Sequence, residues 1–229
     1  MYPAHEASSY SYPYPHPALT TDVVLFTIGE RRLDVLLILR AREPHRGMWA
    51  LPGGFVGIDE ELEACALREL QEETGVSGVY LEQLYTFGQP GRDPRERVIT
   101  VAYCALVPLD RLRLRAGSDA RAAQWFALDA LPPLAFDHAE IIAKAHQRLA
   151  AKLDYSTIAL QFMPGEFTLG DLQQVYEIIG GAPLDKRNFR KKVMGYGCLK
   201  ATRRQRRNGN HRPARLYTVR APGRVEFVK

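Results

Sequence analysis

The segment from Gly54 to Val76 constrains this 229-residue chain more than any other part of its sequence. It reads GFVGIDEELEACALRELQEETGV, and a helix is expected from about Glu60 to Thr74. On that helix Glu69, Glu72 and Glu73 occupy positions i, i+3 and i+4, which places three carboxylates on one face. The fold must therefore hold this acidic face beside something that neutralises it.

Three like charges on one helical face repel one another unless cations lie between them. Ligands that are all oxygen suit the hard cations Mg²⁺ and Mn²⁺, which can bridge a protein to substrate phosphates. Arg68 lies one turn before Glu72 and can hold a carboxylate in place. Gly53 and Gly54 let the backbone approach a ligand or metal closely. An acidic triplet alone is usually a solvated face, but these neighbours favour a metal site.

The fixed positions of the segment resemble the Nudix box, G-x5-E-x7-R-E-U-x-E-E-x-G-U with U aliphatic, and every one of them matches. The resemblance implies the Nudix fold, a mixed sheet between helices. It also implies metal-dependent hydrolysis of a nucleoside diphosphate linked to another moiety. The implied metal ligands are Glu69, Glu72, Glu73 and the backbone of Gly53. The implied catalytic residues are Glu60, Arg68, Glu72 and Glu73.

The rest of the first two thirds of the chain predicts an α+β domain. Runs rich in β-forming residues at 22–28 and 33–40 predict a hairpin, and further strands are expected at 80–85, 98–106 and 124–128. A second helix is expected from Asp137 to Lys152, where Ile141, Ala145 and Leu149 recur at i, i+4 and i+8. Residues 1–19 alternate Pro, Tyr and Ser without a period that could bury a face, so a disordered arm is expected there. The first domain is then expected at 20–154.

Charge divides the chain in two. Residues 155–229 hold 15 Lys and Arg against 5 Asp and Glu, a net charge of +10. Residues 1–154 hold 16 against 21, a net charge of −5. A basic module joined to an acidic one indicates a nucleic-acid-binding appendage, with a basic tail that only aids solubility as the alternative.

The basic module has the pattern of a winged helix-turn-helix domain at 155–229. Thr168 and Asp171 predict a capping box that opens a helix, and Gly180–Gly181 should end it. A basic helix is expected from Asp185 to Met194, followed by strand-like segments at 198–202 and 216–219 that bracket an arginine-rich loop. Helix, glycine turn, basic helix and basic hairpin together predict a DNA-reading arrangement.

Two groups of side chains are expected to contact DNA. Phe189 and Val193 should face the core, so the opposite side of the basic helix could enter a major groove and make bidentate base contacts. Its candidates are Arg187, Asn188, Arg190 and Lys191. Arginines of the loop are expected to be flexible and to contact phosphates or the minor groove. They are Arg203, Arg204, Arg206 and Arg207.

Outside the box, segments 91–106 and 131–142 resemble the ADP-ribose-directed branch of the Nudix proteins. Arg92 and Arg95 flank Asp93–Pro94, and two guanidinium groups suit bidentate contacts to a diphosphate, although a charged surface turn is the alternative. His138 could line the pocket or be structural, and Gly54 completes the expected ligand-binding set. Segment 117–125 has Asp119 but no glutamate, where hydrolases of this branch often place an acidic catalytic residue. This departure argues for reduced catalytic efficiency with binding retained.

A Nudix domain followed by a winged helix resembles the Nudix-related transcriptional regulators of NAD metabolism, over nearly the whole chain after Ala18. The resemblance implies a repressor whose Nudix domain senses ADP-ribose or a related nucleotide and whose winged helix binds a double-stranded DNA operator as part of a homodimer. A second hypothesis stays open because the carboxylates are intact. It is an Mg²⁺-dependent pyrophosphohydrolase of ADP-ribose or nucleoside-diphosphate sugars, whose basic domain serves dimerisation or another partner.

Composition adds limits on where such a protein works. No apolar run approaches the roughly 18 residues of a membrane span, and the N-terminus lacks the pattern of a signal peptide. A cytoplasmic protein without a membrane partner is expected. Charged residues at 25% and aromatic residues at 10% exclude wholesale disorder, collagen and coiled coil.

Overall fold

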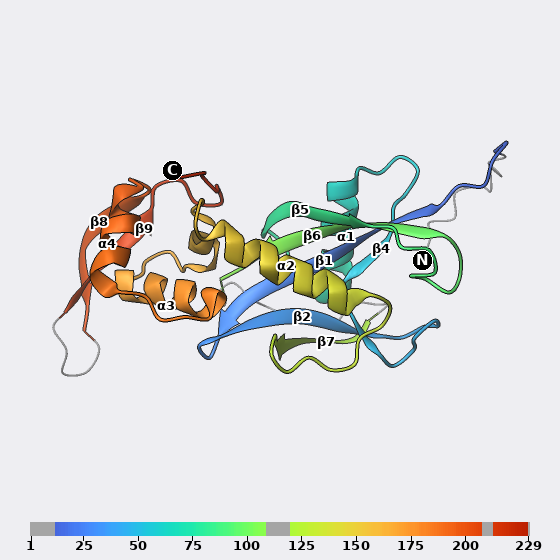
Figure 1. Cartoon of the computed structure of the whole chain (residues 1–229), viewed down its shortest axis with the longest axis horizontal. Coiled ribbons are helices and arrows are strands. Elements are labelled where there is room, and N and C mark those ends of the chain that lie inside the picture. Colours follow the sequence, from blue (N-terminus) through green and yellow to red (C-terminus); the bar gives the residue numbers. More distant parts are fainter. Residues whose placement is uncertain (1–11, 109–119, 208–212, 229) are drawn as a thin grey trace.

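The computed structural model describes residues 12–108, 120–207 and 213–228. Seven strands form one mixed sheet in the N-terminal part (Figure 1). They are β1 (Ala18–Gly29), β2 (Arg32–Arg40), β3 (Trp49–Ala50), β4 (Gly53–Phe55), β5 (Tyr80–Phe87), β6 (Val98–Leu106) and β7 (Ala120–Ala127). β1 pairs in parallel with β6 and antiparallel with β2 and β4, while β5 pairs with β6 and both β3 and β7 pair with β2. The central strand β1 thus carries the site strand β4.

Helices cover both faces of this sheet because the side chains of its strands alternate between two apolar layers. Val23 and Leu25 pack with Leu70 of α1 (Leu62–Thr74) in one layer. Val24 and Phe26, the intervening residues, pack on the other face with α2 (His138–Lys152). Figure 1 shows α2 crossing the near face of the sheet. The predicted mixed sheet between helices is confirmed.

The expected hairpin of β1 and β2 is present, and its turn places Glu30 and Arg31 at φ 47° and 65°. The two shortest strands, β3 and β4, were not expected, because two or three residues show no period. β1 begins at Ala18, inside the arm expected at 1–19. Residues 1–11 of that arm lie outside the described residues.

The C-terminal part forms the predicted winged helix. Its elements are the 3₁₀ helix η2 (Ile158–Phe162), α3 (Leu169–Gly180), α4 (Lys186–Gly195), β8 (Leu199–Arg206) and β9 (Ala214–Val219). The capping box of α3 is present: the Thr168 hydroxyl accepts from the backbone N–H of Asp171 at 3.1 Å, and Oδ2 of Asp171 accepts from the backbone N–H of Thr168 at 2.8 Å. Gly181 ends the helix at φ 70°. Phe189 and Val193 are buried, as the sequence predicts.

One hydrophobic core joins the sheet to the winged helix. Leu149 of α2 belongs to the same buried cluster as Ile158 of η2 and Ile179 of α3. The backbone carbonyl oxygen of Ile179 lies 3.3 Å from Nε2 of His146 on α2. The boundary expected between residues 154 and 155 therefore falls within a packed region. Among the described residues, no helix has both the length and the apolar character needed to cross a membrane.

Candidate functional site

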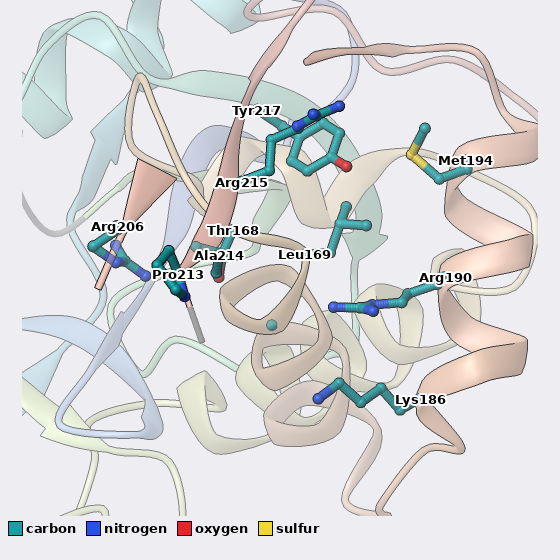
Figure 2. Close-up of a pocket in the computed structure, with 11 residues that line it drawn as sticks. Thr168, Leu169, Lys186, Arg190, Met194, Arg206, Pro213, Ala214, Arg215 and Tyr217 are labelled. Atoms are coloured by element: carbon teal, nitrogen blue, oxygen red, sulfur yellow. The ribbon is translucent and has the colours of Figure 1, made fainter. Parts of the chain in front are cut away.

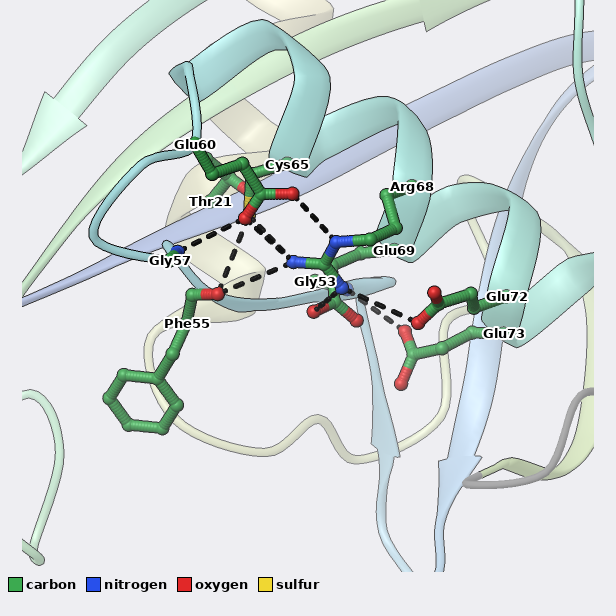
Figure 3. A network of polar contacts seen from close by, with 10 residues as sticks. All are labelled: Thr21, Gly53, Phe55, Gly57, Glu60, Cys65, Arg68, Glu69, Glu72 and Glu73. Atoms are coloured by element: carbon green, nitrogen blue, oxygen red, sulfur yellow. Dashed lines mark hydrogen bonds and ion pairs between the residues drawn. The ribbon is translucent and has the colours of Figure 1, made fainter. Parts of the chain in front are cut away.

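Arg68 of α1 is the centre of a network of ion pairs beside β4 (Figure 3). Its Nε donates to Oε1 of Glu60 at 2.7 Å, and its Nη2 donates to Oε2 of Glu60 at 2.9 Å. Its Nη1 donates to Oε1 of Glu69 at 2.7 Å and to Oε2 of Glu72 at 3.4 Å. One guanidinium therefore orders three of the carboxylates that the sequence singles out, by charge-assisted hydrogen bonds.

Glu60 fastens this network to the loop before α1. Its Oε2 also accepts a hydrogen bond from the backbone N–H of Gly57 at 3.0 Å. The two hydrogen bonds from Arg68 lower the pKa of Glu60 to about 2. Glu60 is therefore ionised at neutral pH with both oxygens engaged, which gives it a positioning role toward Arg68 rather than that of a proton donor.

The two glycines of β4 lie where no other residue fits without displacement. A Cβ on Gly53 would lie 2.2 Å from the carbonyl oxygen of Thr21 on the paired strand β1. A Cβ on Gly54 would lie 2.1 Å from Oε1 of Glu69. β4 is thus packed between the central strand and the acidic face of α1, and the missing side chains bring backbone and carboxylates together.

Two of the three carboxylates on that face are withdrawn from water. The Glu69 side chain is 16% exposed, and burial raises its pKa. The backbone N–H of Gly53 donates to Oε2 of Glu73 at 3.0 Å, yet burial raises the pKa of Glu73 to about 8, and nearby Glu69 adds to the shift. Glu72 is 59% exposed. A cation beside Glu69 and Glu73 favours their ionised forms and so offsets the cost of their burial.

These oxygen donors fit a hard divalent cation in chemistry, although they do not yet surround a common centre. Within residues 12–108, 120–207 and 213–228, no three His, Cys, Asp or Glu side chains are gathered closely enough for a complete metal site. Arg68 holds one oxygen of Glu69 and one oxygen of Glu72 through its Nη1. Each of these two carboxylates has a second oxygen that Arg68 does not engage, and Glu73 makes no ion pair with Arg68. Asp119, the other acidic candidate, lies outside the described residues.

Arg92 is buried against Asp137 and Asp22, which corrects the expectation that it grips a diphosphate. Its side chain is 4% exposed. Its Nε and Nη2 donate to the two carboxylate oxygens of Asp137 at 2.8 and 2.6 Å, and Nη2 lies 3.5 Å from Oδ2 of Asp22. The guanidinium is already occupied by two carboxylates, so it ties the start of α2 to β1.

His138 is buried as well, and the expected pocket-lining role is corrected in favour of the structural one. Its Nδ1 accepts a hydrogen bond from the backbone N–H of Leu51 at 2.8 Å, while its Nε2 lies 3.6 Å from Oδ1 of Asp22. Burial lowers the pKa of His138, so the ring is neutral at pH 7. Asp22, the carboxylate shared by His138 and Arg92, was missed from the sequence because it opens an otherwise apolar run.

Arg95, in contrast, lies at the exposed edge of the site. Its side chain is 40% exposed and donates to Asp93 through Nε at 3.0 Å and through Nη2 at 2.6 Å. Its guanidinium carbon lies 5.1 Å from the centre of the Phe55 ring, which belongs to β4. Of the two arginines expected to contact phosphates, Arg95 is the one a ligand can reach.

Arg40 and Phe136 complete this edge and were missed from the sequence. The guanidinium carbons of Arg40 and Arg95 lie 4.8 and 6.0 Å from the centre of the Phe136 ring. Burial lowers the pKa of Arg40, and repulsion by Arg95 adds to the effect. An anion held between two repelling guanidinium groups would relieve that repulsion. Arg40 could have been noticed in the sequence, because it is the first charged residue after the apolar run 35–39. Nothing in the sequence indicated the backbone φ of 53° at Phe136.

The predicted DNA-contacting residues of α4 are exposed on the winged helix: Arg187, Asn188, Arg190 and Lys191. Asp185 caps this helix, with its Oδ1 accepting from the backbone N–H of Asn188 at 2.8 Å. The helix therefore presents a basic, solvent-facing surface on a rigid, capped element.

The wing arginines do not lie in a flexible loop, which corrects that expectation. Arg203, Arg204 and Arg206 belong to β8, which pairs with β9, and Arg207 follows directly. Arg204 forms an ion pair with Glu166 at 2.7 Å, and Nη2 of Arg206 donates to Oδ1 of Asp171 at 2.6 Å. A charged segment without apolar alternation carries no strand signal, but cross-strand pairing imposes the strand.

Two family matches divide the chain. Residues 16–145 match the NUDIX domain family, and residues 159–219 match the family of the NrtR DNA-binding winged helix domain. An ADP-ribose pyrophosphatase of Methanocaldococcus jannaschii is 40% identical over 129 residues, which cover 56% of this chain and 73% of that protein.

Other relatives match most of the chain. The ADPR responsive transcriptional repressor NtrR of Acinetobacter baylyi is 39% identical over 208 residues, which cover 89% of this chain and 82% of that protein. Shewanella oneidensis NrtR, in a crystal structure with a 27mer DNA, superposes with a TM-score of 0.79 at 38% identity, over 88% of this chain and 93% of that one. Its Nudix domain with ADP ribose gives a TM-score of 0.55 at 39% identity, over 62% and 94%. The chain therefore belongs to the Nudix family, as a member that carries an NrtR-type winged helix domain behind its Nudix domain.

Proposed function

We propose that this protein is a DNA-binding transcriptional repressor whose Nudix domain binds ADP-ribose or a related NAD-derived nucleotide. The observation that carries the proposal is the union of a Nudix site and an NrtR-type winged helix in one packed chain. The relative named as an ADPR responsive repressor aligns with 89% of this chain, so the alignment extends over both matched domains. The similar structures solved with DNA and with ADP ribose support the DNA-binding part and the nucleotide-binding part of the proposal.

The nucleotide would be held at the edge of β4. Arg40 and Arg95 share the Phe136 ring and would take the negatively charged diphosphate between them. Glu69, Glu72, Glu73 and the backbone of Gly53 would hold Mg²⁺ or Mn²⁺. When bound, such an ion would bridge to the phosphates, polarise a phosphoryl oxygen and lower the pKa of a nearby water.

Helix α2 offers a physical link between this site and the DNA-binding part. At its start Asp137 holds Arg92, which also lies near Asp22 of β1. Toward its end His146 lies against the backbone of Ile179 on α3. A nucleotide that displaces the start of α2 would therefore change the contacts between α2 and the winged helix. We place the two functional units at 20–154 and 155–229, in a cytoplasmic homodimer that binds a double-stranded operator and no membrane.

Fluorescence anisotropy with a DNA duplex tests the repressor. The duplex is selected from a random pool by the full-length protein, and binding is measured with and without ADP-ribose and Mg²⁺. We expect tight, salt-dependent binding that ADP-ribose weakens at least tenfold, while AMP, which lacks the diphosphate, leaves it unchanged. A parent protein that binds no duplex above background at low salt contradicts the proposal.

Hydrolysis of the bound nucleotide is a second candidate function, favoured by the complete set of carboxylates and by the 40% identity to an ADP-ribose pyrophosphatase. Turnover of ADP-ribose with Mg²⁺ should be abolished by Glu72→Gln or Glu73→Gln, because each removes a charge from the cation site, while the fold survives. Glu63→Gln, an exposed change on the same helix, is the matched control. Parent-like rates in both site variants would remove these residues from the chemistry.

A further inference from the structure

A basic cavity of about 850 Å³ lies between α4, the start of α3 and the β8–β9 hairpin (Figure 2). Four cationic side chains line it: Lys186, Arg190, Arg206 and Arg215. Apolar groups of Leu169, Met194 and Tyr217 form its wall. None of the described residues that line it is acidic. The cavity belongs to the winged helix and is separate from the Nudix site.

Three of these cations lack a counter-charge in the described part of the chain. Arg206 pairs with Asp171, but the side chains of Lys186, Arg190 and Arg215 make no hydrogen bond or ion pair with any described residue. Three unpaired cations that face one concave surface repel one another and focus a positive potential into it. The cavity is therefore built for an anion that comes from outside this chain.

Arg190 lies on a different side of α4 from the residues that face directly outward. Lys186, Arg190 and Met194 follow at i, i+4 and i+8 and form one stripe along the wall of the cavity (Figure 2). At about 100° per residue, Arg187 and Lys191 form a second stripe, farther from the buried Phe189 and Val193. The sequence placed Arg190 with the outward group, but its side chain lines the cavity.

We propose that the basic cavity is the seat of the DNA phosphate backbone, clamped by Lys186, Arg190 and Arg215, and that Arg190 supplies affinity rather than base recognition. This inference rests on the proposed function. Sequence is read by donors and acceptors that reach base edges, whereas the polar groups facing this cavity are mainly cations, which suit phosphate oxygens. The apolar wall suits the sugar edges of the backbone. The outward stripe is left to enter the groove.

The test compares the two stripes of one helix. Arg190→Ala and Lys186→Ala are measured against Arg187→Ala by anisotropy, on the selected duplex and on a scrambled duplex, at several salt concentrations. Each cavity variant should weaken both duplexes by the same factor, about tenfold at 0.1 M salt, and lower the slope of log K against log salt by about 1. Arg187→Ala should weaken the selected duplex more than the scrambled one.

Each other outcome overturns a definite statement. If Arg190→Ala removes the preference for the selected duplex at unchanged salt slope, Arg190 reads bases and the inference is wrong. If it leaves DNA binding unchanged but abolishes calorimetric binding of free pyrophosphate, the cavity takes a small phosphate ligand instead. Unchanged binding of every probe leaves the cavity without a phosphate role. The proposed function fails separately, when the parent protein binds no DNA at all.

Discussion

The Nudix site and the winged helix use charge in opposite ways. In the first, Arg68 contacts three carboxylates and the nearly inaccessible Arg92 contacts two. In the second, Lys186, Arg190 and Arg215 are exposed and unpaired within the described structure. Breaking a buried ion pair strongly lowers the stability of the fold, because the remaining partner keeps its desolvation penalty. Exposed cations contribute little to folding but attract a polyanion over distance. A lost charge should therefore appear as lost stability in one region and as lost binding in the other.

The largest expected effect is that of Arg92→Met. It leaves Asp137 and Asp22 without their buried partner, so the free energy of unfolding should fall by about 3–5 kcal/mol in urea denaturation. Arg95→Met is the matched control from the same loop. It should cost less stability, roughly 1–2 kcal/mol, because Arg95 is 40% exposed and its buried partner Asp93 keeps the hydrogen bond from the backbone N–H of residue 95. It should instead weaken ADP-ribose binding by about 1.5–3 kcal/mol in calorimetry. Equal loss of stability in both variants would erase the distinction drawn between these arginines.

Arg68→Met should have the next largest effect. Its removal frees Glu60 and Glu69 from their shared partner, and unfolding should become easier by roughly 2–3 kcal/mol in metal-free buffer. The penalty is smaller than for Arg92 because the Arg68 side chain is 36% exposed. Arg187→Met on α4 is the contrast and should stay within about 0.5 kcal/mol of the parent. An Arg68 variant as stable as the parent would show that solvent already screens the network.

Much of the fold was predictable because its signals are local. The periodicity of α2, the capping box at Thr168 and the apolar runs of β1 and β6 are each read from a few neighbouring residues. The order β3-β2-β1-β6-β5 joins residues far apart in the chain, and no local pattern specifies it. The same limit hid β4, whose three residues gain their strand conformation only from pairing with β1.

The candidate site shows the same difference between local and distant contacts. Glu60, Arg68 and Glu69 meet because they lie within one helix and the loop before it, so their spacing predicted their proximity. Arg92 has its partner Asp137 at a separation of 45 residues. Nothing near Arg92 in the sequence shows that its charge is already neutralised. The sequence thus predicted which side chains meet where contacts are local and misjudged this where a distant carboxylate decides.

Protonation of Glu60 in acid should lower the free energy of unfolding by a predictable amount. Arg68 lowers the pKa of Glu60 to about 2, below the ordinary value of 4.5 that the unfolded chain would have. A carboxyl whose pKa is depressed by folding adds stability that is complete above about pH 4.5 and is lost as the pH falls toward 2. Screening at the partly exposed Arg68 reduces this contribution to roughly 1–2 kcal/mol.

Urea denaturation between pH 6 and pH 3 measures this loss. Glu60→Gln should flatten the decline of stability with falling pH. In a protein that already carries Arg68→Met, the same change should leave the slope nearly unaltered, because the partner that depresses the pKa is gone. A Glu60→Gln slope equal to that of the parent would show that the ion pair contributes nothing measurable to folding.

Arg206 tests the distinction between charges that stabilise the fold and charges that bind DNA, because it lines the basic cavity and yet pairs with Asp171. Both side chains are partly exposed, at 40% and 33%, so Arg206→Gln should cost only about 0.5–1 kcal/mol of stability. Asp171 keeps its capping bond to Thr168 in that variant, which limits the loss. Because the charge of Arg206 is already balanced, its removal should lower the salt slope of DNA binding by clearly less than Arg190→Ala does. Arg203→Gln, an exposed change on the same strand, is the control for the general loss of positive charge. If Arg206→Gln reduces the slope as much as Arg190→Ala, the ion pair opens when DNA binds, and pairing within the chain does not separate folding charges from binding charges.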